Sequence, residues 1–178
     1  LPSPALRGAY QLSNAACALT VLECLNEKLP VDIGAIKRGL LLVENPGRFQ
    51  VLPGRPLTVL DVGHNPHAAR ALRRSLINLA FAQKRTAVFS MLSDKDIDGV
   101  LEIVKDQFDE WYIAPLDVPR GMTAEALQAK LEAQNIENIQ TFTSVREAYR
   151  AALAKAGEND RIVVFGSFHT VADVMAAL

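Results

Sequence analysis

The sequence predicts an α/β fold in which a mainly parallel sheet has helices on both faces and follows two opening helices. From about residue 49 onward, short β-rich runs alternate regularly with helical segments, and this alternation is typical of a parallel sheet. Several runs are continuously apolar, as expected for strands that are buried on both faces. The clearest of them cover residues 57–60, 87–89 and 162–165.

The two opening helices are predicted from apolar residues that recur at helical spacing. The first helix is expected over residues 9–29 and the second over residues 32–43, with Asp32 as its N-cap. Asn45-Pro46-Gly47 then interrupts the pattern. We therefore place a domain boundary at this break, between residues 1–45 and 46–178.

The remaining elements are expected in strict alternation. The predicted strands cover residues 57–62, 86–91, 110–114, 138–142 and 161–165. The predicted helices cover residues 66–80, 96–107, 123–134, 144–156 and 168–177. Capping supports two helix starts, because Asn65 precedes a proline suited to the first helical position and Ser144 with Glu147 has the spacing of a capping box.

Composition indicates a soluble globular protein with one main core. The chain has 178 residues, of which 49% are hydrophobic and 22% charged. Its formal charge of -1 provides no global field for nucleic acid or an anionic membrane. It has neither an apolar run of about 20 residues nor a signal-peptide pattern. We therefore expect a cytoplasmic protein with no nucleic-acid or membrane partner. Its first residue, Leu1, hints that the chain was cut from a longer one.

The two cysteines are expected to be structural. Cys17 and Cys24 lie seven positions apart in the first predicted helix. Two turns of helix place them on one face but too far apart for a disulfide. We expect buried thiols rather than a metal or redox pair.

Polar residues gather where ligands bind in open α/β sheets, beyond the carboxyl ends of the strands. The densest cluster contains Asp61 and His64 and is followed directly by a helix, whose free N–H groups favour an anion. Asp61 could accept hydrogen bonds from ribose hydroxyls, and His64 could contact phosphate or stabilise developing charge. The alternative is that Asn65 and Pro66 only begin a helix while Asp61 accepts loop amides. His67 is expected to face solvent.

Arg48 stands at the predicted domain junction. Its planar guanidinium suits phosphate oxygens, and from a hinge it would enter a site when two domains close. The alternative is an exposed arginine anchored by the neighbouring Phe49. Residues 166–170 are a weaker candidate for a phosphate loop, because the alternative for Ser167 is a helix N-cap alone.

Ser93, Asp94 and Lys95 follow the second predicted strand and could handle a charged substrate, although Asp94 or Asp96 could instead cap a helix. The histidines and cysteines do not have metal-ligand spacing. The sequence contains no P-loop, nucleophile elbow or dinucleotide fingerprint. It therefore has no phosphate cradle of its own.

In order, these segments resemble the C-terminal part of the Mur ligase superfamily, and most closely folylpolyglutamate synthase with its bifunctional dihydrofolate synthase form. The matching segments span nearly the whole chain. They are residues 11–16, 46–50, 60–68, 93–96 and 166–171.

The resemblance implies that residues 1–45 are the C-terminal helices of a central ATPase domain and that residues 46–178 are a Rossmann-like C-terminal domain. It also implies a reaction in which ATP phosphorylates a carboxylate of dihydropteroate or a folate. The amine of L-glutamate then attacks the acyl phosphate to form an amide, while Mg²⁺ bridges phosphates. The P-loop, magnesium ligands and modified lysine would belong to an N-terminal region. We therefore expect the isolated chain to be inactive, its partner to be its own N-terminal ATPase domain, and the protein to be a monomer.

Mapped onto this sequence, the resemblance implies that Asn14, Arg48 and Asp61 contact ATP. His64 lies in the same nucleotide-facing loop and is the catalytic candidate. Residues 93–95 are similar to a loop on the substrate side. The sequence departs from the family at two positions: Gly63 stands where alanine is common, and His169 stands where tyrosine often occurs, which leaves its role open.

Two other functions fit the same residues. One is a standalone Rossmann-like module that binds a nucleotide or phosphorylated metabolite without catalysis. The other is a docking domain that presents its first helix to a protein partner. The position of the polar loops on the ligand side of the sheet argues against docking.

Overall fold

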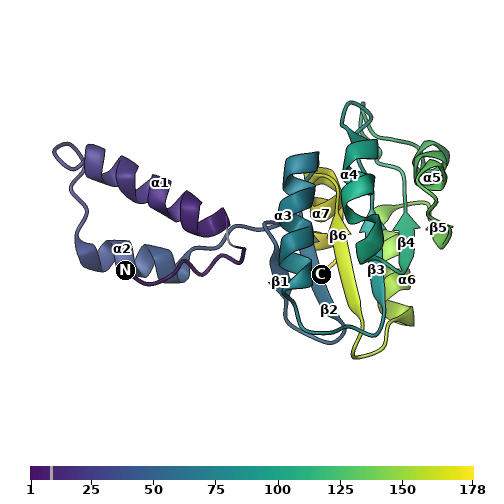
Figure 1. Ribbon diagram of the computed structural model, residues 1–178, viewed down its shortest axis with the longest axis horizontal. Helices are drawn as coiled ribbons and strands as arrows, with labels where there is room; N and C mark the ends of the chain where they lie inside the picture. Colours follow the sequence, from purple (N-terminus) through teal and green to yellow (C-terminus); the bar gives the residue numbers. More distant parts are fainter. Residues whose placement is uncertain (9) are drawn as a thin grey trace.

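The computed structural model describes residues 1–8 and 10–178. Two opening helices, α1 (Tyr10–Cys24) and α2 (Ile33–Leu42), lie to one side of an α/β unit (Figure 1). Position 9, where the first helix was predicted to begin, lies outside the described residues. The predicted end of that helix at residue 29 is wrong, because residues after Cys24 form turns, among them a bond from the Asn26 amide to the Glu23 carbonyl.

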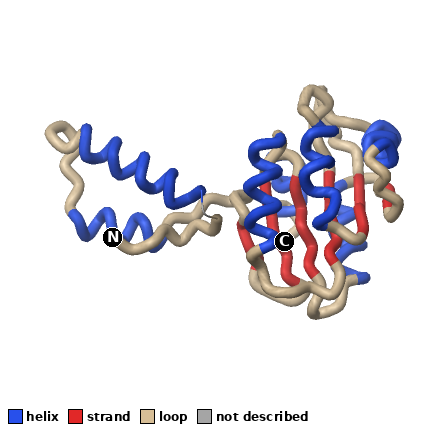
Figure 2. Tube along the Cα trace, viewed as in Figure 1, coloured by secondary structure: helices blue, strands red, loops and turns tan. Residues whose placement is uncertain are grey.

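The α/β unit is built on one six-stranded sheet (Figure 2). Its strands are β1 (Gln50–Leu52), β2 (Leu57–Asp61), β3 (Arg85–Phe89), β4 (Glu110–Ile113), β5 (Ile139–Thr141) and β6 (Arg161–Phe165). They lie in the order β1-β2-β6-β3-β4-β5. All neighbours are parallel except β1, which pairs with β2 in antiparallel register. The predicted mainly parallel sheet is confirmed, whereas β1 was not predicted.

Four helices and a short 3₁₀ turn connect these strands, and a fifth helix follows the last strand. They are α3 (Pro66–Ile77), α4 (Ile97–Val104), the turn η1 (Lys105–Gln107), α5 (Ala124–Ala133), α6 (Val145–Lys155) and α7 (Phe168–Met175). The predicted caps Asp32, Asn65 and Ser144 each accept a backbone N–H of the first turn. The capping box differs in one bond, because the Glu147 carboxylate accepts the amide of Thr143 rather than that of Ser144.

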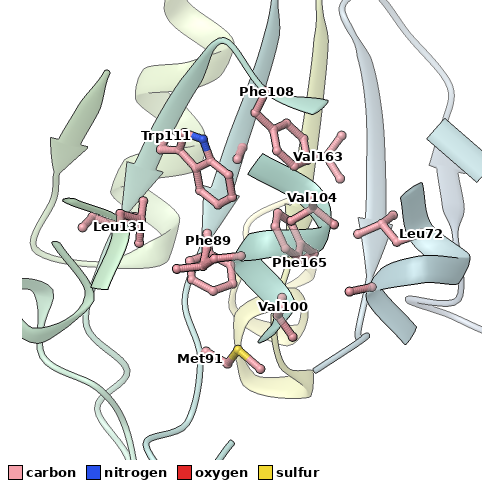
Figure 3. Packing of buried hydrophobic residues seen from close by; sticks show 14 of the residues in the cluster. Leu72, Phe89, Met91, Val100, Val104, Phe108, Trp111, Leu131, Val163 and Phe165 are labelled. Carbon is pink, nitrogen blue, oxygen red and sulfur yellow. The ribbon is translucent and has the colours of Figure 1, made fainter. Parts of the chain in front are cut away.

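The helices cover both faces of the sheet, as predicted. Alternate residues of β6 point to opposite sides: Val163 packs in a cluster with α3, α4 and α5, and Val164 packs in a cluster with α6 and α7. Aromatic rings fill the first cluster around β6 (Figure 3). The Phe165 ring centroid lies 5.0 Å from that of Phe89 and 5.5 Å from that of Phe108. This packing fixes the carboxyl ends of β3 and β6, and the candidate site begins at the end of β6.

The opening helices bury much less than the α/β unit. Gln11 is the only fully buried residue described in α1, and none is buried in α2. Leu12, Val21 and Leu42 are among the exposed apolar residues. The prediction that Cys17 and Cys24 are buried is wrong, because both thiols are exposed. Helical periodicity predicts an apolar face, but no described element covers this one. None of the described helices is long and apolar enough to cross a bilayer.

Candidate functional site

The candidate site lies where the chain connections diverge at the carboxyl edge of the sheet. β2 and β6 are adjacent and parallel, but the helices that follow them pack on opposite faces, α3 in one core cluster and α7 in the other. Their connecting loops therefore separate and leave room at the edge. A ligand in an open α/β sheet binds at such a switch point. The two loops are residues 62–65 and 166–167.

The segment that enters β1 runs beside this edge and carries Arg48. Gly47 adopts a left-handed φ of 71°, and a Cβ there would approach Val62 Cγ1 to 2.7 Å. Phe49 is also left-handed, with φ of 48°, although it is not glycine, and its side chain is buried in the core. A left-handed phenylalanine is unfavourable unless its surroundings hold it. The backbone of Arg48 is thus set between two constrained residues.

Asp61 holds this backbone in place. Its Oδ2 accepts the Phe49 amide at 3.0 Å, and its Oδ1 accepts the Gly63 amide at 2.7 Å. The carboxylate is buried, with the residue 7% exposed. Burial raises the pKa of Asp61 above its ordinary value, although the two amide hydrogen bonds and the charge of Arg48 oppose the rise. One predicted alternative, an aspartate that accepts loop amides, is therefore present in the structure.

The side chain of Arg48 is exposed and lies on an aromatic ring. Its Cζ is 5.6 Å from the centroid of Phe168, the first residue of α7. His64 packs near the same ring, with centroids 6.2 Å apart and planes inclined by 52°. Arg48, His64 and Phe168 therefore come together at the switch point although they lie far apart in the sequence. Arg48 makes no side-chain hydrogen bond or ion pair with the described residues.

One ring nitrogen of His64 is hydrogen-bonded, and the other has no partner among the described residues. Its Nδ1 donates a hydrogen bond to the Val62 carbonyl at 2.9 Å, since a carbonyl can only accept. The opposite nitrogen, Nε2, has no partner in the part of the chain that the structure describes. Asn65 and Pro66 begin α3 directly behind it. The imidazole thus lies at a helix N-terminus, where an anion is favoured.

The start of α1 approaches this group from the opening helices. The pKa of Tyr10 is raised by burial and by the negative charge of Asp61, and lowered by Arg48 and a hydrogen bond with Gln11. Tyr10 lines one cavity together with Phe49, the residue whose amide Asp61 accepts, so the phenol lies beside the segment that carries Arg48. Asn14, one turn further along, donates a hydrogen bond to Gln11 at 2.9 Å and is itself exposed. It makes no described contact with Arg48, Asp61 or His64.

The loop with Ser93, Asp94 and Lys95 is tied to another part of the edge. Asp94 forms ion pairs with Arg120 at 2.5 Å and with Lys95 at 3.4 Å. Desolvation alone would raise the pKa of Asp94. The hydrogen bond from Lys95 and the charge of Arg120 outweigh it and lower the pKa. Asp96 is the N-cap of α4, as one alternative predicted. The loop shares no described contact with Arg48 or His64.

Two cavities flank the group without containing it. One of about 380 Å³ lies between the opening segment and α3 and is lined by Tyr10, Phe49 and basic residues of α3. Another cavity, of about 790 Å³, lies beyond the ends of β4 and β5 and is also lined by exposed His169 of α7. Neither is lined by Arg48, Asp61 or His64. His67 is exposed, as predicted.

The described residues contain no group of three or more His, Cys, Asp or Glu side chains arranged to hold a metal ion. Asp61, the buried carboxylate of the site, directs both oxygens at backbone amides. A catalytic Mg²⁺ usually takes one or two carboxylates together with substrate phosphates. These residues therefore do not fit the role of magnesium ligands.

Comparison with known proteins identifies the family. Residues 47–168 match the Mur ligase, glutamate ligase domain. The chain belongs to the Mur ligase family. Within it, the chain is 43% identical over 165 residues to the dihydrofolate synthase/folylpolyglutamate synthase of Escherichia coli K12, a match that covers 93% of the chain and 37% of the relative. The predicted resemblance to the C-terminal region of these enzymes is confirmed.

Solved structures agree with this assignment. E. coli FolC in complex with DHPP and ADP has a TM-score of 0.87 and 42% identity, over 99% of this chain and 40% of that chain. A bifunctional folylpolyglutamate synthase/dihydrofolate synthase with Mn, AMPPNP and L-glutamate bound has a TM-score of 0.85 and 46% identity, over 99% of this chain and 41% of that chain. The chain thus spans well under half the length of these relatives.

Sequence reasoning found three of the clustered residues and missed two. Arg48, Asp61 and His64 were predicted from a loop and a hinge. Tyr10 was not singled out, and Phe168 was given no role although it lies in the 166–170 segment that was considered as a phosphate loop. A signal existed for Phe168: it is an aromatic residue at the first position of a helix on the ligand side.

Proposed function

We propose that this domain closes the nucleotide site of an ATP-dependent amide ligase that adds L-glutamate to dihydropteroate or a folate. The observation that carries the proposal is the group at the β2/β6 switch point, where exposed Arg48 and half-buried His64 lie beside a helix N-terminus. A guanidinium and a helix N-terminus both favour phosphate oxygens. Relatives solved with ADP or AMPPNP support a nucleotide as the ligand.

The proposed roles follow from the local contacts. Arg48 reaches the nucleotide from the hinge, and its constrained backbone limits where the guanidinium can point. Asp61 holds the hinge and the His64 loop through its two amide bonds, and its remaining lone pairs are available to ribose hydroxyls. His64 contacts phosphate or stabilises developing charge through Nε2. Asn14, on the side of α1, is proposed as a further nucleotide contact.

The proposed chemistry transfers the γ-phosphoryl group of ATP to a carboxylate, which gives ADP and an acyl phosphate. The amine of L-glutamate then attacks the acyl carbon, an amide forms, inorganic phosphate leaves, and the amine loses a proton. Mg²⁺, when bound, would neutralise phosphate charge. The described residues supply no ligand set for it, and the sequence contains no P-loop. The magnesium ligands and the P-loop are therefore assigned to an N-terminal ATPase domain, which is the proposed partner of the C-terminal domain.

The domain organisation is part of the proposal. Residues 1–45 are assigned to the end of the ATPase domain and residues 46–178 to the C-terminal domain. The sparse burial of α1 and α2 supports this division, because exposed leucines on α1 and α2 suit a neighbouring domain surface. Ser93, Asp94 and Lys95 are assigned to the substrate side, at a distance from the nucleotide group.

The test is an assay of the full-length protein as its gene encodes it. We expect ATP- and Mg²⁺-dependent joining of L-glutamate to dihydropteroate or tetrahydrofolate, detected by mass spectrometry together with ADP. A substrate labelled with ¹⁸O in its carboxylate should transfer one labelled oxygen to the released phosphate. Joining without this transfer would exclude the acyl phosphate. Absence of any glutamylated product from the folded, nucleotide-binding protein would refute the proposed function.

A further inference from the structure

We propose that Phe168 is a positioning residue, whose ring holds the guanidinium of Arg48 in the orientation that meets the nucleotide. The inference rests on the proposed function, because it takes Arg48 as a nucleotide contact. It adds a residue with no polar atom in its side chain to the site, and it gives the β6–α7 loop a defined task.

The ring is placed at a surface where it does not serve the core. Phe168 is 55% exposed, whereas Phe165, three residues earlier, is 1% exposed. A single exposed phenylalanine has no meaning by itself. Phe168 differs because the guanidinium of Arg48 lies 5.6 Å from its centroid. A cation within about 6 Å of an aromatic face is attracted by the ring quadrupole.

Among the described residues, the ring of Phe168 is the one specific contact of the Arg48 guanidinium. No hydrogen bond or ion pair to its guanidinium is found among residues 1–8 and 10–178. A long, unrestrained arginine samples many rotamers, and ordering it when a ligand binds lowers affinity. A ring that holds the side chain beforehand reduces that loss. The aromatic face leaves the in-plane N–H donors of the guanidinium available to phosphate oxygens.

A buried hydroxyl network anchors Phe168 in turn. Ser167 Oγ accepts the Thr170 amide at 3.0 Å, and Thr170 Oγ1 donates to the Ser90 carbonyl at 2.8 Å. Ser90 Oγ donates to the Ala114 carbonyl at 2.6 Å. These three side chains are almost fully buried. The start of α7 is therefore bonded to the residue that follows β3, and that residue is bonded to the one that follows β4.

Close packing at Gly166 holds the same loop against the sheet. Gly166 has φ of 116°, and a Cβ there would lie 2.3 Å from the Ser90 carbonyl oxygen. The loop can approach so closely only without a side chain. The backbone that carries Phe168 is therefore held against the sheet, whereas Arg48 lies in the hinge segment before β1. The contact between them joins the hinge to the sheet.

The test compares variants of the full-length enzyme by kcat/KM for ATP. Phe168→Ala is expected to lower it about two- to fivefold, the size of an exposed cation–π contact. Phe168→Trp should retain or exceed wild-type activity, because indole offers the best face to a cation. In an Arg48→Ala background, Phe168→Ala should have no further effect. Phe81→Ala is the matched control, since Phe81 is 89% exposed and lies in the loop before β3.

Two results would overturn the proposal. If Phe168→Ala has the same effect with and without Arg48, the ring acts on the ligand directly and not through the arginine. If Phe168→Trp is as impaired as Phe168→Ala, the aromatic face is not what matters. A melting temperature measured for each variant separates these effects from loss of folding.

A second readout is independent of activity. In the 178-residue chain, the Arg48 side-chain protons should show an upfield ring-current shift in NMR spectra, which Phe168→Leu should abolish. Identical shifts in both proteins would overturn the contact whatever the enzyme does. Absence of ligase activity in the wild type would refute the proposed function alone.

Discussion

Replacing Asp61 by asparagine tests the link between the hinge and the ligand loop. The two side-chain oxygens accept the Phe49 and Gly63 amides at 3.0 and 2.7 Å. Asparagine keeps one acceptor but turns an NH₂ group toward the other amide, which leaves a buried donor without a partner. Such a loss costs about 1–3 kcal/mol. For a domain of this size the melting temperature should fall by about 2–12 °C.

Asp160→Asn is the matched control for this change. Asp160 also accepts two backbone amides, those of Lys84 at 3.1 Å and Gly157 at 2.8 Å, but it lies just before β6, at the opposite edge of the sheet. Both variants should lose stability in calorimetry or thermal denaturation. Only Asp61→Asn should also lower kcat/KM for ATP, because it loosens the segment that carries Arg48. Unchanged melting would contradict the described contacts, and equal kinetics in the two variants would refute a role for Asp61 at the nucleotide.

The stability difference between wild type and Asp61→Asn should change with pH in a defined direction. The pKa of Asp61 in the folded state lies above its ordinary value of 3.8 because of burial. The stability that its protonation contributes is therefore fully present below pH 3.8 and is lost as pH rises through the folded-state pKa. The difference in melting temperature between wild type and Asp61→Asn should therefore narrow as the pH rises through the folded-state pKa of Asp61. A difference that widens would show that the amide bonds outweigh burial.

Three further predictions concern the hinge, the opening helices and the isolated chain. Gly47→Ala should destabilise the domain by about 1–2 kcal/mol, because the left-handed backbone at this position disfavours a Cβ. Gly39→Ala in α2, where a Cβ would meet open space, should be neutral or stabilising. Equal melting temperatures of the two variants would contradict the strain assigned to Gly47. Amides of residues 10–42 should exchange faster than those of β3 and β6 in hydrogen-exchange measurements, and equal protection would count against the sparse packing of α1 and α2. The purified 178-residue chain should not hydrolyse ATP, and Mg²⁺-dependent turnover that survives repeated purification would contradict the absence of a phosphate cradle.

Local chemistry made much of the fold predictable. Continuous apolar runs such as 162–165 indicated buried parallel strands, and side chains such as Asp32 and Asn65 marked helix starts that the structure confirms. β1 was missed because three half-buried residues carry too little periodic signal. The central position of β6 also had no local signal, because strand order depends on contacts between distant segments.

The limits at the site are of the same kind. Asp61 and His64 were found because a polar loop at a strand end is visible in sequence. Whether Asp61 binds loop amides or a ligand depends on the position of Phe49, twelve residues earlier. Phe168 was missed because a cation–π contact depends on how two distant loops meet. Cys17 and Cys24 were misjudged because an apolar helical pattern cannot show what covers it.

The measurement that tests the account most directly is kcat/KM for ATP in the full-length enzyme after Arg48→Ala, with Arg55→Ala as control. Arg55 is also exposed, and among the described residues its one ion pair is with Glu158 at 3.6 Å, away from the switch point. Loss of charge-assisted hydrogen bonds to the nucleotide predicts a fall of about ten- to a hundredfold for Arg48→Ala, with an unchanged melting temperature. Arg55→Ala should keep wild-type kinetics. Equal kcat/KM values for the two variants would contradict a nucleotide site at the switch point.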